Sequence, residues 1–203
     1  YHIPQINLDD PEVLQLNQQI YEELQYNQIE SDIAEMGFPA YYASYEWAVN
    51  GDILSLVVEN TPTLWDGTVY YVYNISILRG IQVSNEEVIA SAGFTMTDYY
   101  TRSEQALGSK FWEGWDRNSE GFLYNAQNPS FCEMFNVQLE NTISSQNVQC
   151  ALPYINSDGQ ICIVAPVYSM AGADYYYDDL NLMDFIMAPD YNKGLEVHIP
   201  QIN

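Results

Sequence analysis

Basic residues are scarce in this sequence. Only 5 Lys and Arg residues oppose 28 Asp and Glu residues, which gives a formal net charge of -23 at pH 7. Such a chain would repel nucleic acid and anionic lipid, so neither is expected as a partner. The excess of acid favours a solubility adaptation of an exported protein. The alternative is a surface that attracts a cationic partner in a salt-dependent manner.

Motifs for catalysis and metal binding are also missing. The two histidines, His2 and His198, lie in a repeated terminal hexapeptide, which is a poor place for a catalytic base. The G-x-S-x-G, H-E-x-x-H and glycine-rich phosphate-binding patterns do not occur. Among 28 acidic residues, paired carboxylates arise by chance. We therefore expect no enzyme activity, no catalytic residue, no metal site and no cofactor.

The three cysteines have no C-x-x-C spacing, which argues against a zinc site. Cys150 and Cys162 flank the turn SDGQ. A two-residue turn would place Cys162 opposite Ile155, too far from Cys150 for a disulfide. Free buried thiols are expected, and a bridge between Cys132 and Cys150 is the remaining alternative.

Long apolar runs are absent too. No stretch of about eighteen apolar residues occurs, so this segment is not expected to insert into a membrane. The chain starts at Tyr1 rather than at an initiating Met, which suggests that an upstream segment was removed or omitted. We expect an extracellular or cell-envelope protein, anchored by a segment that this sequence does not contain.

Hydrophobic periodicity predicts a helix followed by three strands. Asp10 as N-cap and Pro11 in the first position predict a helix. Its inward residues are Val13, Leu16, Ile20 and Leu24 or Tyr21. The period then changes to two, which predicts antiparallel strands over 41–49, 53–60 and 68–78, with a tight turn at Asn50 and Gly51. The first strand carries Tyr41, Ala43, Tyr45, Trp47 and Val49 on one face.

Helices and a hairpin follow. The capping box of Ser84 and Glu87, ended by Gly93, predicts one helix, and further helices are expected over 95–115 and 128–143. The closing hairpin consists of strands over 150–156 and 161–170, with a strand or loop at 173–182. Pro166 predicts that the returning strand is an edge or contains a bulge.

This order of elements predicts an α+β fold with an N-terminal helix packed on an antiparallel meander, a helical middle and a C-terminal β-hairpin. We expect a helix-plus-meander lobe over 1–101, a helical and hairpin lobe over 102–190, and a linker with the start of a possible tandem repeat over 191–203.

Three stretches, HIPQINLDDPEVLQLNQQI, YEWAVNGDILSLVVE and TVYYVYNISILRGIQVSNEEVIASAGF, resemble the extracytoplasmic domains of unknown function DUF4163 and DUF3298. The stretch PYINSDGQICIVAPVYSMAGADYYYDDLNL resembles the hairpin and closing strand of the DUF3298 part. That family occurs in secreted, lipid-anchored or membrane-tethered proteins of Gram-positive bacteria. It includes the lysozyme-binding sensory domain of an anti-sigma factor, and it accompanies polysaccharide deacetylase domains. The resemblance implies a binding role in the envelope, towards a cell-wall glycan or a cationic protein such as lysozyme.

Aromatic and acidic residues are the candidate binding residues, because exposed rings stack on sugars and anchor protein interfaces. The candidates are Tyr175, Tyr176, Tyr177, Asp178, Asp179, Trp65, Trp112 and Trp115. At least one of the three consecutive tyrosines should be exposed, since neighbours in a strand point to opposite faces. The competing interpretation is ordinary core packing. The acidic stretch also lacks the residue order of a calcium loop, which favours a solvated turn.

The hexapeptide HIPQIN occurs at 2–7 and again at 198–203. Pro4 cannot donate to a strand ladder, so an extended lead-in is expected. The second copy either begins a tandem domain, with a boundary near Gly194, or occupies on a neighbouring molecule the groove used by the first copy. We favour the tandem domain. The functional alternatives are a sensory or binding domain, an accessory domain of an envelope deacetylase, and an assembly module that self-associates through His198 to Asn203.

Overall fold

The computed structural model describes residues 4–24, 32–64, 67–170, 175–183 and 190–197. The helices are α1 (Pro11–Glu23), α3 (Asn85–Ser91), α4 (Met96–Glu113), α5 (Glu120–Asn125), α6 (Pro129–Ile143) and α7 (Ser145–Cys150). The strands are β1 (Tyr41–Asn50), β2 (Ile53–Pro62), β3 (Val69–Ser76), β4 (Ile81–Gln82), β5 (Leu152–Ile155), β6 (Ile161–Tyr168) and β7 (Tyr175–Asn181). The fold is α+β, as the sequence predicts.

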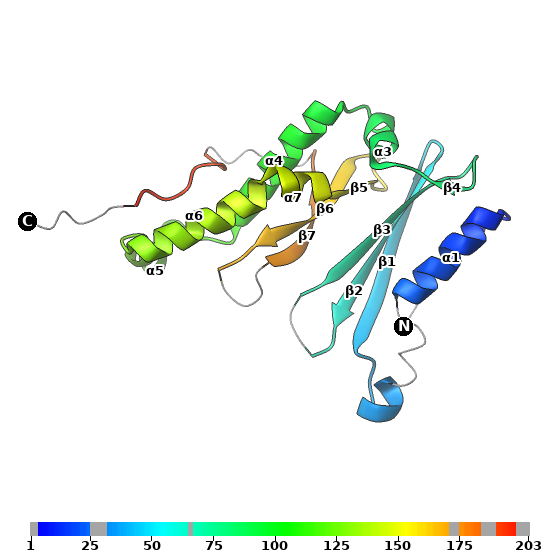
Figure 1. Cartoon of the computed structure of the whole chain (residues 1–203), viewed down its shortest axis with the longest axis horizontal. Coiled ribbons are helices and arrows are strands. Elements are labelled where there is room, and N and C mark those ends of the chain that lie inside the picture. Colours follow the sequence, from blue (N-terminus) through cyan, green and yellow to red (C-terminus); the bar gives the residue numbers. More distant parts are fainter. Residues whose placement is uncertain (1–3, 25–31, 65–66, 171–174, 184–189, 198–203) are drawn as a thin grey trace, which may run out of the picture.

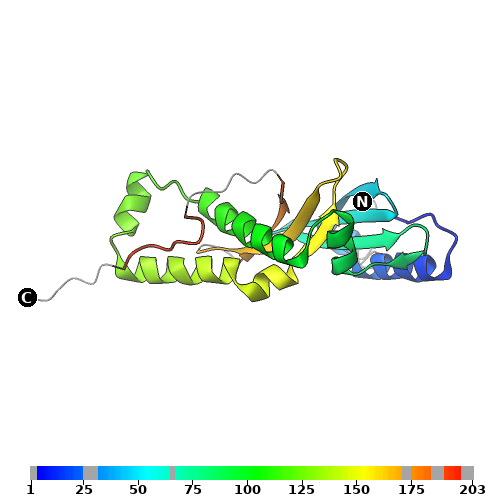
Figure 2. The same ribbon diagram turned by 90° about the horizontal axis from the view of Figure 1, so that it is seen from above.

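The strands form two antiparallel sheets that lie between helices. Sheet A has the order β1-β2-β3-β4 and sheet B has the order β5-β6-β7. Figure 1 shows the layers in sequence from right to left: α1, sheet A, sheet B and the helices α4 and α6. Seen from above, the molecule is elongated, with α1 at one end and α5 at the other (Figure 2). Sheet A is therefore covered on one face by a helix and on the other by sheet B.

Helix α1 begins as its sequence predicts. Asp10 caps it, with its side chain accepting from the backbone N–H of Glu12, and Pro11 occupies the first turn. The helix buries its apolar stripe against the Leu56, Val58, Tyr73 and Ile75 side of sheet A. The stripe consists of Val13, Leu16, Ile20 and Leu24. The inward residue at the end of the stripe is thus Leu24 and not Tyr21.

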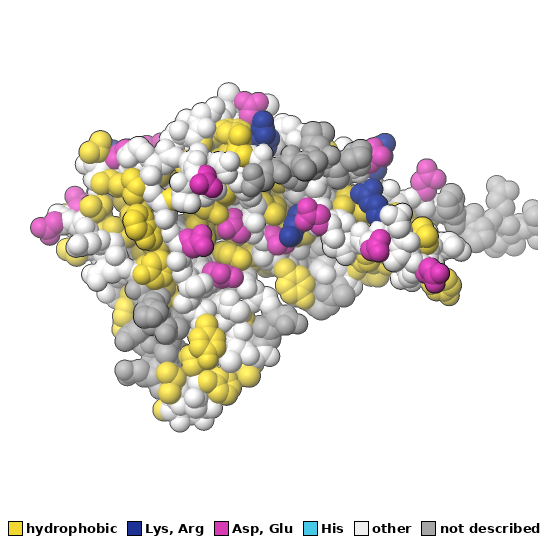
Figure 3. Space-filling model, turned by 180° about the vertical axis from the view of Figure 1, so that it is seen from behind, with side chains coloured by type: hydrophobic (Ala, Val, Ile, Leu, Met, Phe, Trp, Pro, Cys, Tyr) yellow, Lys and Arg dark blue, Asp and Glu magenta, His cyan; other side chains and the backbone are white. Residues whose placement is uncertain are grey.

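Strand β1 lies at the edge of sheet A, and three side chains of its apolar face are largely exposed. Tyr45, Trp47 and Val49 are 41%, 63% and 51% exposed. They share a face with Val58, Leu56 and Leu54, their partners across the ladder. Helix α1 covers the middle of that face but does not extend over its edge. Hydrophobic side chains accordingly show at this end of the molecule in Figure 3.

The largest core lies between sheet B and helices α3, α4 and α6. Phe111, Trp112, Phe122 and Phe135 form a cluster of edge-to-face and tilted rings there. The capping box of Ser84 and Glu87 is present at α3. Two short helices, α5 and α7, were not expected from the sequence. The second of them replaces the predicted strand start at Cys150.

The hairpin of sheet B differs by one residue from its predicted register. Cys162 pairs with Tyr154, not Ile155, because the side chain of Asn156 accepts the backbone N–H groups of Asp158 and Gln160 and closes a longer turn. This places Tyr154 and Cys162 on the face towards sheet A. No disulfide joins Cys132, Cys150 and Cys162, all of which are described.

Two further expectations about the hairpin are corrected. Strand β6 is central in sheet B, although Pro166 suggests an edge. Pairing with β5 ends at Val164, so at Pro166 only β7 lies beside the strand, and a proline fits there. Cys150 is exposed at the end of α7, whereas a buried thiol was expected.

Buried polar side chains join the two sheets. Ser55 donates its hydroxyl to Asn74 at 2.7 Å, and Asn74 donates its amide to the carbonyl of Pro153 at 2.8 Å. The backbone N–H of Ile155 donates to Ser55 at 3.1 Å. The expected lobe boundary between residues 101 and 102 falls inside α4, so a cut there would divide a continuous helix.

The terminal segments are each held by one asparagine of a helix. Asn17 of α1 brackets Ile6, accepting its N–H and donating to its carbonyl, both at 2.8 Å. Asn136 of α6 does the same for Leu195, at 2.6 and 2.9 Å. The first HIPQIN copy is therefore seated through Ile6, and the segment near Gly194 packs on α6. The second copy, His198 to Asn203, lies outside the described residues.

Among the described helices, none is both long and apolar enough to span a membrane.

Candidate binding cleft

The predicted tyrosine-rich acidic stretch forms strand β7, and its side chains divide between two faces. Tyr175, Tyr177 and Asp179 lie on the face towards sheet A, whereas Tyr176 and Asp178 lie on the face towards the helices. Tyr175 is 41% exposed, which confirms that at least one of the three tyrosines reaches solvent. The single acidic, tyrosine-rich surface that the sequence suggests is therefore two separate surfaces.

The helix side of β7 borders a hollow of about 400 Å³ that we call the helix-side hollow. Tyr176 and Asp178 line it together with Trp115 and Lys110. Lys110 lies 3.6 Å from the carboxylate of Asp178 and 3.7 Å from that of Glu113. Burial raises the pKa of Asp178, and Lys110 opposes this shift. The hollow thus joins three of the predicted binding residues.

Of the other predicted tryptophans, Trp112 does not contribute to this surface. Trp112 is 7% exposed, and its ring lies against Phe135 on one side and under the guanidinium of Arg117, 3.6 Å from the ring centroid. Trp112 is therefore a core residue, which agrees with the competing interpretation and not with a role in binding. Trp115 is half-buried against Phe131 and Phe135. Trp65 lies outside the described residues.

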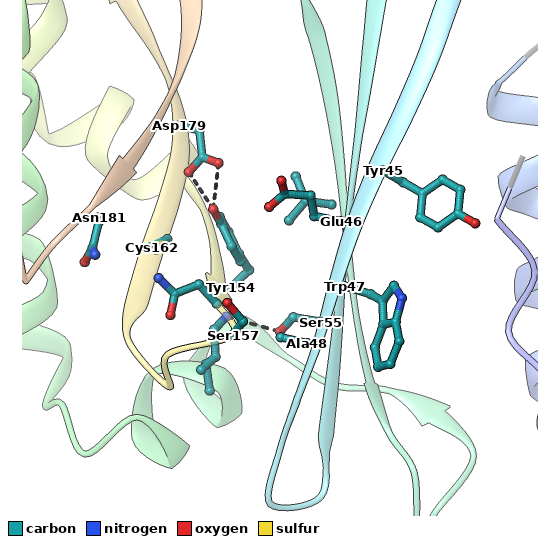
Figure 4. Close-up of a pocket in the computed structure, with 13 residues that line it drawn as sticks. Tyr45, Glu46, Trp47, Ala48, Ser55, Tyr154, Ser157, Cys162, Asp179 and Asn181 are labelled. Carbon is teal, nitrogen blue, oxygen red and sulfur yellow. Dashed lines mark hydrogen bonds between the residues drawn. The ribbon is translucent and has the colours of Figure 1, made fainter. Parts of the chain in front are cut away.

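A second hollow, the inter-sheet cleft, opens between the two sheets. It has a volume of about 600 Å³ and is open to solvent. Its acidic residues are Glu46 of β1 and Asp179 of β7, and Figure 4 shows both side chains directed into the space between the sheets. The remaining polar lining comes from Ser55, Tyr154, Asn156, Ser157 and Asn181.

Tyr154 fixes the position of the acidic group on β7. Its hydroxyl lies 2.6 and 2.7 Å from the two carboxylate oxygens of Asp179. Tyr154 is 9% exposed, and burial is the main cause that raises the pKa of its hydroxyl, followed by the bond to Asp179. The phenol therefore stays protonated at neutral pH and acts as a donor to Asp179.

Negative charge accumulates in the inter-sheet cleft. Partial desolvation between the two sheets raises the pKa of Asp179, although the residue still borders solvent. Repulsion from Glu46, Glu59 and Asp178 adds to this shift, while the bond from Tyr154 lowers the pKa. Tyr70, on the same face of sheet A as Glu46, has its pKa raised to about 12, first by burial and then by the charge of Glu59. Carboxylates that repel each other in this way favour the arrival of a cation.

The basic side chains of the protein do not line this cleft. All five Lys and Arg residues fall in the described ranges, and each has a partner elsewhere. Arg79 pairs with Glu87, Lys110 with Asp178 and Lys193 with Asp190. Arg102 lies over Phe94, and Arg117 lies over Trp112. No Lys or Arg side chain of the protein therefore supplies a positive charge to the inter-sheet cleft.

The opposite face of β1 borders an apolar groove of about 410 Å³, the β1 groove. Tyr45, Trp47 and Val49 form one wall, and residues 4–8, which include most of the first HIPQIN copy, form the other. In Figure 4, Tyr45 and Trp47 point away from the inter-sheet cleft, on the opposite side of β1 from Glu46. A single strand thus separates an acidic cleft from an apolar groove.

The arrangement of acids does not suit a calcium ion. Asp178 and Asp179 are neighbours in a strand, so their carboxylates point to opposite faces and cannot meet at one ion. Asp174 lies outside the described residues. Within the described ranges, no cluster of three or more His, Cys, Asp or Glu side chains could hold a metal. The sequence favoured a solvated turn for this stretch, and this prediction is wrong, because residues Tyr175–Asn181 form strand β7.

Sequence reasoning missed Glu46 and Tyr154 as cleft residues. Glu46 interrupts the apolar residues of a strand, and only the packing of sheet B against sheet A gives it an acidic neighbour. Tyr154 lies on β5, and the predicted pairing of β5 with β6 differs from the observed pairing by one residue. Comparison with protein-family models, with curated proteins and with solved structures found no match to this chain. The resemblance to DUF4163 and DUF3298 therefore stays a prediction.

Proposed function

We propose that this protein is a non-enzymatic binding or sensory domain of the cell envelope that engages a cationic protein. The observation that carries the proposal is the inter-sheet cleft, in which Glu46 and Asp179 lie without a basic residue among the lining residues. A Lys or Arg side chain of a partner would relieve the repulsion between these carboxylates. The net charge of -23 would steer such a partner to the protein from a distance.

The resemblance to DUF4163 and DUF3298 supports the same proposal, because a lysozyme-binding sensory domain belongs to that family. It also supports an extracellular location for this chain. A cationic partner such as lysozyme agrees with both the resemblance and the charge of the cleft. The proposal does not depend on a catalytic group, since Glu46 and Asp179 serve only as fixed charges.

Titration calorimetry with lysozyme tests this function. We expect heat of binding at low salt that falls steeply as salt is raised, and no binding of lysozyme whose lysines have been acetylated. The double variant E46Q/D179N should bind about tenfold more weakly, since two cleft charges are lost. A matched control, E133Q/E140Q, removes two exposed charges of α6 and should bind almost as well as the unaltered protein.

Two results would contradict the proposal. One is the absence of binding by lysozyme and by other cationic proteins at low salt. The other is an equal loss of affinity in both double variants, since this would mean that only total charge matters and the cleft has no role.

A cell-wall glycan is a second candidate ligand, and the helix-side hollow favours it. Trp115 and Tyr176 provide aromatic rings beside the carboxylate of Asp178, a combination that can stack on a sugar ring and accept its hydroxyl groups. Such binding would suit an accessory domain of an envelope deacetylase. Soluble peptidoglycan fragments in the same calorimeter distinguish the two ligands, because glycan binding should be lost in Tyr176→Ala and unchanged in E46Q/D179N.

A further inference from the structure

Strand β1 has an unpaired outer edge. It is the first strand of sheet A, and among the described residues no strand pairs with its outer side. Its ten residues pair continuously with β2, from Tyr41 with Pro62 to Asn50 with Ile53, without a bulge. The strand YYASYEWAVN also contains neither Lys nor Pro. Bulges, lysines and prolines are the usual means by which proteins protect an edge strand from pairing, and β1 uses none of them.

The backbone groups that face outward can be assigned from the ladder. The N–H of Thr63 donates to the carbonyl of Ala40 at 2.8 Å, one pair beyond the end of β1. Hydrogen-bonded pairs alternate along an antiparallel ladder, so even-numbered residues of β1 bond to β2. The N–H and C=O groups of Tyr45, Trp47 and Val49 therefore point away from the sheet, towards the open edge.

The two sides of this edge differ in chemistry. On one side lies the β1 groove, with the exposed Tyr45, Trp47 and Val49. On the other lies the inter-sheet cleft, with Glu46 and, across the space, Asp179. Successive side chains of any strand added along this edge would point alternately into the apolar groove and into the acidic cleft.

We propose that the outer edge of β1 receives an extended segment of the partner as an added strand, and that this segment alternates basic and apolar side chains. The inference rests on the proposed function, because it takes the partner to be cationic. Backbone hydrogen bonds to Tyr45, Trp47 and Val49 hold the segment. Its basic side chains lie beside Glu46, and its apolar side chains lie on Trp47 in the β1 groove.

Charge selects this occupant over a second copy of the chain. Two molecules that each carry a net charge of -23 repel one another, and pairing of two β1 edges would bring a second set of acidic clefts close. A cationic segment instead gains from both faces of the strand. Pairing of β1 with β1 of a second copy is a separate outcome that the experiment below can detect.

The experiment uses two synthetic peptides of the same composition. One alternates Lys and Val along nine residues, and the other has the same residues with the lysines and valines grouped in blocks. Binding is followed by the fluorescence of tryptophan and by the backbone amide resonances of Tyr45, Trp47 and Val49. We expect the alternating peptide to bind about tenfold more tightly than the block peptide, with shifts at these three amides.

Two variants at position 45 distinguish the contribution of the backbone N–H to peptide binding from the contribution of the side chain. Tyr45→Ala removes the ring but keeps the outward N–H, whereas Tyr45→Pro removes the N–H as well without disturbing the ladder to β2. The proline variant should bind the alternating peptide at least about fivefold more weakly than the alanine variant. Glu46→Gln should reduce the preference for Lys over uncharged residues at the facing positions.

The possible results distinguish this inference from the proposed function. If lysozyme binds and E46Q/D179N weakens that binding, but Tyr45→Pro binds the alternating peptide like Tyr45→Ala, strand addition is overturned and the function stands. Equal affinity for the two peptides also overturns strand addition. Dimers in sedimentation experiments that disappear in Tyr45→Pro would show that a second copy takes this edge, which overturns the proposed occupant.

Discussion

The hydroxyl of Tyr154 donates to the carboxylate of Asp179 and thereby joins β5 to β7 across the intervening strand β6. The pair lies on the face of sheet B that looks towards sheet A. Because Tyr154 is buried and Asp179 borders solvent, the bond fixes an acidic group at the mouth of the inter-sheet cleft. The contact therefore positions one of the two carboxylates of the proposed binding site.

Removal of that hydroxyl should raise the pKa of Asp179 further. In Tyr154→Phe the carboxylate loses the donor that lowers its pKa, while burial and the repulsion from Glu46 remain. The unfolding free energy should fall by about 1 kcal/mol, the usual net value of a hydrogen bond. A carbon-detected NMR titration of the Asp179 carboxyl measures the shift. Tyr45→Phe, which alters a hydroxyl outside this contact, should leave the titration unchanged, and an unaltered pKa in Tyr154→Phe would contradict the prediction.

Mild acidification should first stabilise the protein and then destabilise it. The pKa values of Asp178 and Asp179 are raised above the ordinary 3.8, so the folded chain takes up these protons more readily than the unfolded chain. Stability therefore increases as the pH falls through their folded pKa values towards 3.8. Asp52 and Glu87 have lowered pKa values, and their contributions to stability are lost as the pH falls below 3.8 for Asp52 and below 4.5 for Glu87, towards their folded pKa values.

Thermal melting between pH 7 and pH 2 measures this behaviour. The double variant D178N/D179N should show a smaller gain in melting temperature on mild acidification, because the two raised carboxyls are gone. The general relief of charge repulsion remains in both proteins and cancels in the comparison. Identical melting curves against pH for the two proteins would be inconsistent with the raised pKa values.

Alanine should have opposite effects at two helical glycines. A Cβ at Gly108 in α4 would lie 2.6 Å from the ring of Tyr191 and 2.9 Å from its carbonyl oxygen. Gly108→Ala should therefore lower the unfolding free energy by about 1–2 kcal/mol, despite the better helix propensity of alanine. Gly121→Ala in α5 meets nothing within 4 Å and should raise it by up to about 1 kcal/mol. Chemical denaturation measures both, and a stabilised Gly108→Ala would show that the segment at Tyr191 does not pack on α4.

Asn136 should protect the segment around Leu195 from hydrogen exchange. Its side chain bonds both backbone groups of Leu195, so Asn136→Ala should speed hydrogen exchange at the Leu195 amide by about tenfold or more. Asn136→Asp keeps the acceptor for the N–H but loses the donor to the carbonyl, and it should have an intermediate effect. Exchange at Ile6, held by Asn17, serves as an internal reference that neither variant should change.

Local signals in the sequence predicted the elements well. Asp10 and Pro11 begin α1, Ser84 and Glu87 cap α3, and period-two alternation identifies β1 to β3, because each of these depends on residues close in sequence. The short helices α5 and α7 were missed, since six residues hold too little periodicity to distinguish a helix from a loop.

The candidate site was predicted less well, because it depends on contacts between distant segments. The pattern of β1 predicts that Tyr45 and Trp47 share a face, but it cannot show that α1 stops short of the sheet edge. Likewise, three consecutive tyrosines in β7 predict that at least one ring is exposed. Which ring reaches solvent depends on how sheet A and the helices pack on the two faces of sheet B, and the sequence does not show this packing. The turn at Asn156 shifted the hairpin by one residue and so moved Tyr154 into the cleft.

The asparagine clamps at Ile6 and Leu195 also determine how the molecule would respond to force. They hold the two described ends of the chain in opposite halves of an elongated body (Figure 1). Tension applied between residues 4 and 197 would load these two clamps before it loads either sheet. Each clamp has only two hydrogen bonds, so both terminal segments should detach under a small force while the sheets and the cleft between them stay intact. The molecule could therefore lengthen under load and still present the same cleft.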